Sequence, residues 1–351
     1  MDIKFEFWAE FDLFSENNKK RIINGFISDD SLPIPWSHIT DLSTRQHILA
    51  QLLSIDDKCA GKTKCKDYVK GKNGFQKWYY AGDLQNPRGD FQMFLCKRLR
   101  WMGDILNLAN SHETVSPSLP DLSIFPKGSW AIQVNFTLKK PYISKDDVDF
   151  YIIDNPVKKE WVFKVPYVAP SQWKGALRST MIRELVSKLE NGKIDEDEFV
   201  TERLQLYRLF GNEKDGTASF LNRVLALHRV GPVPEDGTEN EEWQEKFREE
   251  ILKIEKEFDR EPREKEYLVG NIEGYQGSLH FYPTFFDRIG LEVINPHDRN
   301  TGAGKKPIYF ECVPAGTPGV FTLLYVPPVN TDENTARADL KAVAKGVQAM
   351  L

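Results

Sequence analysis

Apolar and polar residues follow regular patterns along the first third of this chain, and these patterns predict its local structure. Strict alternation predicts a strand over residues 2–13. Apolar residues three and four apart predict helices over 17–26, 42–54 and 91–108. A loop rich in lysine and glycine covers 57–75, and prolines with serines over 111–127 mark a boundary. We therefore expect residues 1–127 to form an N-terminal extension of unknown role.

A second series of patterns begins near residue 128 and predicts a mixture of strands and helices. The expected strands cover 130–139, 151–153, 161–164, 277–286, 289–295, 307–313 and 319–326. The expected helices cover 171–190, 196–209 and 335–351, with Gly211 as a C-cap signal for the second. This order favours an α+β domain over residues 128–351, with helices against one face of an antiparallel sheet. Of the known arrangements, the ferredoxin-like (RRM-like) one fits best.

Two polar stretches interrupt this domain. Residues 212–273 predict an insertion with a strongly charged surface helix within 235–266, to which we assign no chemistry. Residues 287–313 predict a hairpin whose tip, Asn295–Lys306, carries two glycines and four basic side chains counting His297. A connection this long and this positively charged is too polar for a core. We expect it to extend either into solvent or into a partner.

The composition limits the class of protein. With 351 residues, 40% of them hydrophobic and 28% charged, the chain is typical of a soluble globular protein with room for two domains. No apolar run approaches the ~20 residues of a membrane span, and the N-terminus lacks the features of a signal peptide. We therefore expect a cytoplasmic protein that does not enter the membrane. The formal net charge of −5 disfavours an indiscriminate nucleic-acid binder, although basic stretches at 58–72 and 97–100 leave room for a local basic groove.

The four cysteines are too few and too scattered for a disulfide framework. Cys59 and Cys65 have five residues between them in a basic loop, and this spacing permits a structural zinc site. Such a site needs two further ligands, for which Cys96, His47 and His112 are the nearby candidates. Reduced thiols in a mobile basic loop are the other interpretation.

The stretch from residue 151 to residue 178 contains the strongest chemical signal. An apolar strand ends at a lone carboxylate, Asp154, and Asn155-Pro156 then stiffens the backbone. Further along, Ser171 is a suitable N-cap for a helix that carries Lys174 and Arg178 one turn apart on one face. A helix N-terminus with two cations favours an anion, so we interpret the stretch as a phosphate site near a carboxylate in the chain. An ordinary capped helix and a turn-capping aspartate are the alternative.

Two separated stretches resemble one known family. Ile153–Val157 reads I-D-N-P-V, and 166–178 reads P-Y-V-A-P-S-Q-W-K-G-A-L-R. The second stretch has D-R-N-T-G-A at 298–303, then Pro307, Glu311 and V-P-A-G at 313–316, while L-F-G at 209–211 lies between the two. These residues resemble the RAMP superfamily of type III CRISPR effector subunits, most closely its RNA-cleaving backbone subunit. The resemblance covers about 128–351 apart from the insertion.

The sequence departs from the family pattern in several places. The family's P-G-S-S loop reads A-P-S-Q-W here, and the arginine usual after the proline at 307 is replaced by Ile308. The glycine-rich loop that the family has after its last helix is not found before Leu351. These differences bear on whether the chain cuts RNA.

The resemblance implies a function and a set of site residues. It implies a ferredoxin-like subunit of a ribonucleoprotein that binds guide RNA and cleaves complementary target RNA through Asp154, with Mg²⁺ or another divalent cation at that aspartate. The hairpin 287–313 would be a thumb that enters the guide–target duplex. The implied partners are guide RNA, target RNA and other effector subunits, including neighbouring RAMP proteins. The implied RNA contacts are Lys158, Lys159, Ser171, Gln172, Trp173, Lys174, Arg178, His297, Arg299, Lys305 and Lys306.

Alternatives exist at each level. The neighbouring carboxylates Asp146, Asp147 and Asp149 compete with Asp154 for the catalytic role. The family also has members that cap or space the complex without cutting. A stand-alone RNA-binding module is the third class, with aromatic residues as stacking platforms, for which the candidates are Trp130, Phe281 and Phe285.

Overall fold

The chain folds into two compact units, each assembled from separate stretches of sequence. The computed structural model describes residues 90–110, 115–145, 155–211, 215–233, 241–264, 275–297, 299, 302, 304, 308–328 and 331–351. The first unit contains the described part of Met1–Ser118 together with Val134–Val168 and Pro283–Phe321. The second unit contains Leu119–Gln133, Ala169–Tyr282 and Thr322–Leu351.

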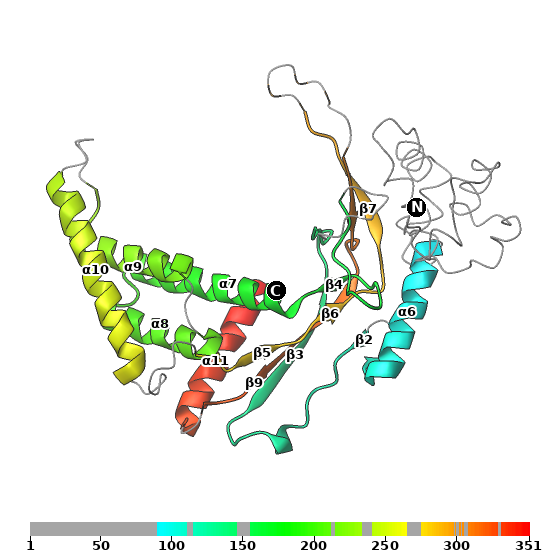
Figure 1. Ribbon diagram of the computed structural model, residues 1–351, viewed down its shortest axis with the longest axis horizontal. Helices are drawn as coiled ribbons and strands as arrows, with labels where there is room; N and C mark the ends of the chain where they lie inside the picture. The colour runs from blue at the N-terminus through cyan, green and yellow to red at the C-terminus, as the bar shows by residue number, and fades with distance from the viewer. Residues whose placement is uncertain are drawn as a thin grey trace, which may run out of the picture. The chain divides into compact units, whose positions relative to one another are not determined.

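The described part of the first unit contains one helix, labelled in Figure 1, and three antiparallel strand pairs. The helix is α6, Asp90–Leu106. The pairs are β1 (Ala109–Asn110) with β2 (Val115–Ser116), β4 (Tyr167–Val168) with β6 (Thr284–Phe285), and β7 (Gly290–Ile294) with β8 (Ile308–Cys312). The last pair is the hairpin that the sequence predicts.

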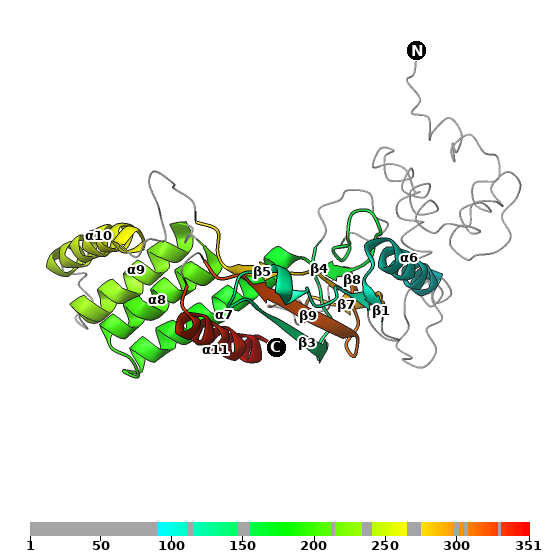
Figure 2. The same cartoon turned by 90° about the horizontal axis from the view of Figure 1, so that it is seen from below.

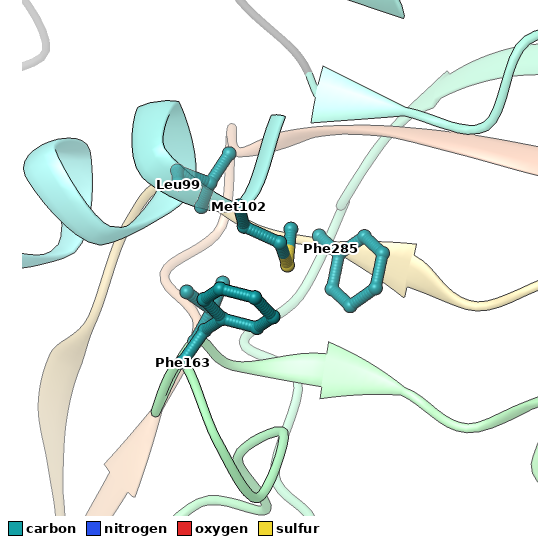
Figure 3. Close-up of a cluster of buried hydrophobic side chains, with 5 residues drawn as sticks. Leu99, Met102, Phe163 and Phe285 are labelled. Atoms are coloured by element: carbon teal, nitrogen blue, oxygen red, sulfur yellow. The ribbon is translucent and has the colours of Figure 1, made fainter. Parts of the chain in front are cut away.

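The core of the first unit forms where α6 packs on the short strands. Figure 3 shows Leu99 and Met102 of α6 facing Phe163 and Phe285, and Val165 completes the cluster. Leu99 and Met102 are three apart on one helical face, so the spacing that predicts this helix also selects its buried side. The buried apolar surface attaches α6 to the segment that precedes β4.

The described part of the second unit combines most of a three-stranded sheet with five α-helices. The strands β3 (Trp130–Thr137), β9 (Pro318–Tyr325) and β5 (Leu279–Phe281) lie in the order β3-β9-β5, and the unit boundary falls inside β3 and β9. A short 3₁₀ helix, η3 (Leu122–Ile124), precedes β3. The helices are α7 (Pro170–Glu190), α8 (Glu196–Phe210), α9 (Asp215–Val230), α10 (Glu241–Glu264) and α11 (Glu333–Met350). Helix α7 packs against α8, α9, α11 and β5, while α10 lies along α9 (Figure 2).

A buried polar network joins three elements of the second unit. The Asp339 carboxylate of α11 has no exposed surface and accepts hydrogen bonds from Gln205 Nε2 (2.9 Å) and Arg208 Nε (3.0 Å) of α8. It also accepts a hydrogen bond from the Tyr325 hydroxyl of β9 at 2.8 Å. Burial, followed by the neighbouring Asp339 charge, raises the pKa of Tyr325 well above its usual value. The network therefore ties α8 and α11 to the sheet.

The structure differs from two of the predicted elements. Residues 161–164 form a turn, not a strand, because the Glu160 carboxylate accepts the N–H groups of Val162 (2.9 Å) and Phe163 (2.6 Å). The expected strand 277–286 is divided into β5 and β6, and Pro283, which has no N–H to donate, lies in the gap. Helix α9 was absent from the prediction, although its buried Leu221 and Leu225 are one turn apart.

The α+β class is confirmed, since helices and antiparallel strands share the described chain, whereas the ferredoxin-like arrangement stays a prediction. The extension 1–127 and the domain 128–351 also stay predictions. The expected elements at 2–13, 17–26, 42–54 and 151–153, and the loop 57–75, lie outside the described residues. None of the described helices is long and apolar enough to cross a membrane.

Candidate functional site

The segment that follows the predicted catalytic aspartate is held against β8. Asp154 lies outside the described residues, as do Asp146, Asp147 and Asp149. Asn155, the next residue in the chain, donates from Nδ2 to the Tyr309 carbonyl at 3.2 Å and accepts the Glu311 N–H at 2.9 Å. It also forms a parallel bridge with Phe310. The first stretch of the family resemblance therefore meets the strand that carries the second.

A buried ion pair strengthens this contact. Lys159 Nζ bonds to Glu311 Oε2, and the side chains are each only 2% exposed. The same oxygen accepts the Val157 N–H at 3.3 Å, and Lys159 Nζ also donates to the Val157 carbonyl at 3.4 Å. Lys159 was expected to contact RNA, but a buried lysine committed to a buried carboxylate has no surface to offer a phosphate. We assign it a structural role instead.

Lys158 lies on the other side of this segment. Its backbone N–H donates to the Ser144 carbonyl at 2.8 Å and its carbonyl accepts the Tyr167 N–H at 3.3 Å. Because side chains alternate along extended backbone, Lys158 is partly exposed where Val157 and Lys159 are buried. It keeps its place among the candidate RNA contacts.

The β7–β8 hairpin presents an apolar surface near its tip. Its register runs from Gly290↔Cys312 to Ile294↔Ile308, and an antiparallel bridge between His297 and Gly304 continues it beyond the strands. The directly paired Ile294 and Ile308 are both exposed, as are His297 and Arg299 further out. Lys305 and Lys306 lie outside the described residues. An apolar cross-strand pair beneath exposed basic groups is typical of a surface that meets a partner.

Helix α7 begins differently from the prediction. Its N-cap is Ala169, with Pro170 as the first helical residue, so Ser171 is not the cap and lies exposed one position inside the helix. Proline suits this position because its backbone already has the helical φ and lacks an N–H that would need a partner. Gln172 Oε1 accepts the Ala169 N–H at 2.9 Å and closes the end of the helix. The side chain of Gln172 is therefore engaged within the chain.

The two cations of α7 lie next to an open stretch of helix. Lys174 and Arg178 are partly buried, and both take part in interactions within the chain. Between them Gly175 and Ala176 are exposed, and no atom of the described chain comes within 4 Å of the place where a Gly175 side chain would begin. Trp173 is partly buried. The start of α7 thus combines cations with room for a close backbone approach.

One glycine of the resemblance, Gly211, has a structural role in the second unit. Gly211 has φ +84° and ends α8, and a side chain there would begin 2.6 Å from the Tyr275 carbonyl oxygen. On the facing strand, a side chain on Gly277 would begin 2.3 Å from a backbone atom of Phe210. Glycine is therefore required at the end of the L-F-G motif, because two backbones pack closely there.

The V-P-A-G motif forms the turn between β8 and β9. Thr317 N–H donates to the Pro314 carbonyl at 3.3 Å, and Gly316 has φ +81° at the third position of the turn. A positive φ at this position is what a type II turn requires and what glycine provides at least cost. Leu138 pairs with the last two residues of the turn. Its N–H donates to the Thr317 carbonyl, and its carbonyl accepts the Gly316 N–H.

Metal-binding residues are not gathered in the described part of the chain. No group of three or more histidine, cysteine, aspartate or glutamate side chains able to hold a metal occurs among the described residues. Cys59 and Cys65, the predicted zinc ligands, lie outside them, as does Asp154. Burial, with Glu292 and Glu311 as further causes, raises the pKa of the Cys312 thiol to about 12, so this thiol stays neutral. The divalent cation and the zinc ion stay predictions.

The aromatic residues proposed for a stand-alone RNA-binding module pack within the molecule. Trp130 stacks on Tyr325 with ring centroids 4.6 Å apart, and Phe281 stacks on Phe210 at 6.4 Å. Phe285 is buried in the core of the first unit. These contacts favour a core role for all three rings.

Comparisons with known proteins find similar solved structures only. No family model and no curated protein matches the chain. One similar structure is titled "Cryo-EM structure of the Type III-B Cmr-beta bound to cognate target RNA", with 12% identity, a TM-score of 0.34 and coverage of 97% of this chain and 83% of that chain. Another, "CRISPR RNA-guided surveillance complex, pre-nicking", has 14% identity, a TM-score of 0.28 and coverage of 63% and 71%.

A third similar structure is "Crystal structure of Cmr6 from Pyrococcus furiosus", with 14% identity, a TM-score of 0.27 and coverage of 62% of this chain and 90% of that chain. Two of these titles name Cmr proteins, and the likeness to them is one of structure at 12% and 14% identity. At TM-scores below 0.5 the likeness assigns no role to any residue. The functional argument therefore depends on the motifs and contacts of the chain itself.

Proposed function

We propose that this protein is an RNA-binding backbone subunit of a type III CRISPR ribonucleoprotein, and that it cleaves target RNA paired to the guide at Asp154. The observation that carries the proposal is the contact of Asn155 with Tyr309 and Glu311. This contact joins the I-D-N-P-V motif to the strand that leads into the basic hairpin. In this proposal residues 128–351 adopt the ferredoxin-like arrangement and the protein works in the cytoplasm with other effector subunits.

Guide RNA is held by its backbone. The start of α7 faces the sugar-phosphate chain with the exposed Ser171 and the partly buried Gln172, Trp173, Lys174 and Arg178, and Gly175 lets that chain approach closely. Lys158 adds positive charge in the segment after Asp154. Because these groups contact phosphates and not base edges, the choice of sequence is left to pairing between guide and target.

Target RNA is distorted by the hairpin, which acts as a thumb. The exposed pair Ile294 and Ile308 offers an apolar wedge, and His297, Arg299, Lys305 and Lys306 supply charge around it. Splaying a nucleotide out of the duplex aligns its 2′-hydroxyl with the adjacent phosphate. Positioning of this internal nucleophile supplies much of the acceleration. The Asp154 carboxylate then assists removal of the 2′-hydroxyl proton.

A divalent cation fits this chemistry through one carboxylate and the RNA itself. Mg²⁺ is commonly bound by one or two carboxylates together with substrate phosphates. Glu311, whose backbone pairs with Asn155, is committed to Lys159 and is not free to serve as a second acidic ligand. Asp154 would therefore hold the ion with the scissile phosphate, and the ion would neutralise charge on that phosphate.

The catalytic assignment is tested by substitution within the assembled complex. Asp154→Ala should retain guide RNA and partner chains and lose the cut at the position of this subunit. Asp149→Ala, which removes a competing carboxylate from the same connection, should cut normally. If the Asp154→Ala complex cuts target RNA as the unmodified complex does, the assignment is wrong.

The second candidate function is a spacing subunit that binds guide RNA without cutting. The N-terminus of α7 favours this candidate. Pro170 has no N–H, and the Gln172 side chain accepts the N–H of Ala169, so fewer backbone donors remain for a phosphate. A complex with wild-type Asp154 that retains guide RNA with strong salt dependence and gives no metal-dependent cut at this position would establish it.

A further inference from the structure

Two tryptophan side chains on the surface of the first unit each lie beside a cation. Trp161, in the turn before β4, is 74% exposed, and Lys164 Nζ lies 5.3 Å from the centroid of its ring. Trp101 of α6 is 45% exposed, and the Arg98 guanidinium carbon lies 5.3 Å from its centroid. Both distances are within the range of a cation–π contact. Tryptophan is enriched at interfaces, because its ring is largely apolar while its N–H can still bond to a polar partner.

The turn that carries Trp161 is rigid. Its ends are closed by the Glu160 N–H, which donates to the Val165 carbonyl at 2.8 Å, and by the Lys164 N–H, which donates to the Glu160 carbonyl at 3.0 Å. The Glu160 carboxylate satisfies the two N–H groups inside the turn. Lys164 has φ +59°, a left-handed conformation that costs a lysine about 1–2 kcal/mol. These hydrogen bonds fix the backbone of the turn, and the Trp161 side chain on it is exposed.

Phe163 contacts the first tryptophan and shares a turn with the second. Its ring is buried against Met102 and Phe285, as Figure 3 shows, and this anchors the turn to the core. The Trp101 ring meets Phe163 edge-on, with centroids 5.1 Å apart and an interplanar angle of 71°. Trp161 precedes Phe163 by two positions in the same turn. The surface, which we name the two-tryptophan patch, comprises Trp101, Arg98, Trp161 and Lys164.

The charge around this patch favours an anionic ligand. Lys158 and Lys145 lie on neighbouring paired segments, since the Lys158 N–H donates to the Ser144 carbonyl and Val157 bridges Lys145. The Glu160 carboxylate is occupied by the N–H groups of its own turn. Among the described side chains of α6, Asp104 is the single acidic one, against the cations of Arg98 and Arg100. Among these described side chains, the cations therefore outnumber the carboxylates.

We propose that the two-tryptophan patch is a stacking site for unpaired nucleotides of RNA. A base stacks on the open face of the Trp161 indole, and the Lys164 ammonium on the ring neutralises a neighbouring phosphate. A protein partner would have to bury that ammonium against an apolar surface, which is unfavourable without a counter-ion, whereas RNA brings its own. The proposal rests on the proposed function only in taking RNA as the ligand, and it uses neither Asp154 nor the start of α7.

The test measures binding of the full-length protein to a single-stranded RNA that carries 2-aminopurine, whose fluorescence is quenched when it stacks. Trp161→Ala should remove most of the quenching and weaken binding by about 5-fold to 150-fold, the equivalent of 1–3 kcal/mol per stacked base. Trp161→Phe should retain most of both, because phenylalanine still offers a ring. Ile124→Ala, at a residue of the second unit that is 76% exposed, should change neither.

A Lys174→Ala, Arg178→Ala double variant separates this inference from the proposed function. If the double variant loses RNA while Trp161→Ala binds and quenches normally, the stacking site is refuted and the α7 contact stands. If Trp161→Ala alone loses RNA, the stacking site is supported and the α7 contact fails. Unchanged quenching together with loss of partner chains on co-purification would make the patch a protein interface and would also overturn the proposal.

Discussion

At the scale of single residues, Gly175 is informative about a ligand of the chain. It lies in the first turns of α7, where glycine costs about 0.5–1 kcal/mol relative to alanine. No atom of the described chain approaches the position that a side chain would occupy. Because nothing in this part of the molecule needs the missing side chain, we interpret the gap as room for a ligand backbone.

Substitution of Gly175 should therefore separate stability from binding. Gly175→Leu should leave the thermal unfolding midpoint unchanged or slightly raised, since leucine is a better helix former and meets open space. It should weaken guide RNA binding about tenfold, which corresponds to 1.4 kcal/mol. Filter binding together with thermal unfolding checks both effects. Ala176→Leu, on the adjacent exposed position, is the matched control, and equal loss of binding in both variants would contradict the interpretation.

Cys312 should behave as a buried and unreactive thiol. Burial raises its pKa from 9.0 to about 12, so it stays protonated in the folded protein where an unfolded thiol ionises. Its contribution to stability is complete below pH 9 and is lost as the pH rises from about 9 towards 12. Peptide mapping after iodoacetamide treatment at pH 8 should show Cys312 modified only after denaturation, and Cys312→Ala should flatten the alkaline loss of stability. Rapid labelling of the native protein would contradict this.

At the scale of elements, the central feature is the attachment of the 155–159 segment to β8. The segment itself has little regular structure, and Asn155, Val157 and Lys159 are held through bonds to Tyr309 and Glu311. These bonds join the chain after Asp154 to the base of the β7–β8 hairpin. A change in one element is therefore expected to disturb the other.

Removal of Glu311 should show this coupling. Glu311→Ala leaves the Lys159 ammonium buried without a counter-ion and should cost about 3–5 kcal/mol of unfolding free energy. Urea denaturation measures the loss. Glu292→Ala, on the facing strand where the glutamate is exposed, should change stability by less than about 0.5 kcal/mol. The Lys159→Met, Glu311→Leu double variant should recover most of the loss, and failure to do so would point to a role beyond the ion pair.

At the scale of the whole molecule, stability of the second unit depends on how its helices are joined to the sheet. Asp339 receives bonds from Arg208, Gln205 and Tyr325 and is entirely buried. A separate cluster joins α8, α9 and α10, in which Arg229 pairs with Glu196, Glu250 and Glu257. Some charged side chains of the predicted insertion are thus paired with others inside the same unit.

Loss of Asp339 should therefore unfold this unit more readily than loss of an exposed acid. Asp339→Ala removes the acceptor of three side chains and should cost about 3–5 kcal/mol. Hydrogen exchange over α8 and α11 measures the local effect, and urea denaturation measures the total. Glu333→Ala, which removes an exposed ion pair with Arg337 on the same helix, should have almost no effect. Comparable losses in the two variants would refute a central role for the Asp339 network.

The predictions from sequence succeeded where local pattern decides the structure. Helices α6, α7, α8 and α11 and the β7–β8 hairpin follow their predicted ranges closely, because apolar spacing selects a buried face within a single element. Helix α9 escaped notice inside the predicted insertion 212–273, although its leucines keep helical spacing. The turn at 161–164 was taken for a strand because its apolar residues resemble one, and only the Glu160 side chain shows that the backbone reverses there.

The sequence by itself determined the α+β class, the family resemblance and the chemical types available, since these depend on local spacing and on motifs read along the chain. Only the tertiary structure decided which charged side chains are buried and paired within the molecule. Lys159 looked like a surface cation until the fold brought it to Glu311, which is 152 residues away in the chain. In the same way Trp161 was expected in a strand, whereas the structure has it exposed in a turn. Burial depends on partners distant in sequence, and local pattern carries no information about which distant partner arrives.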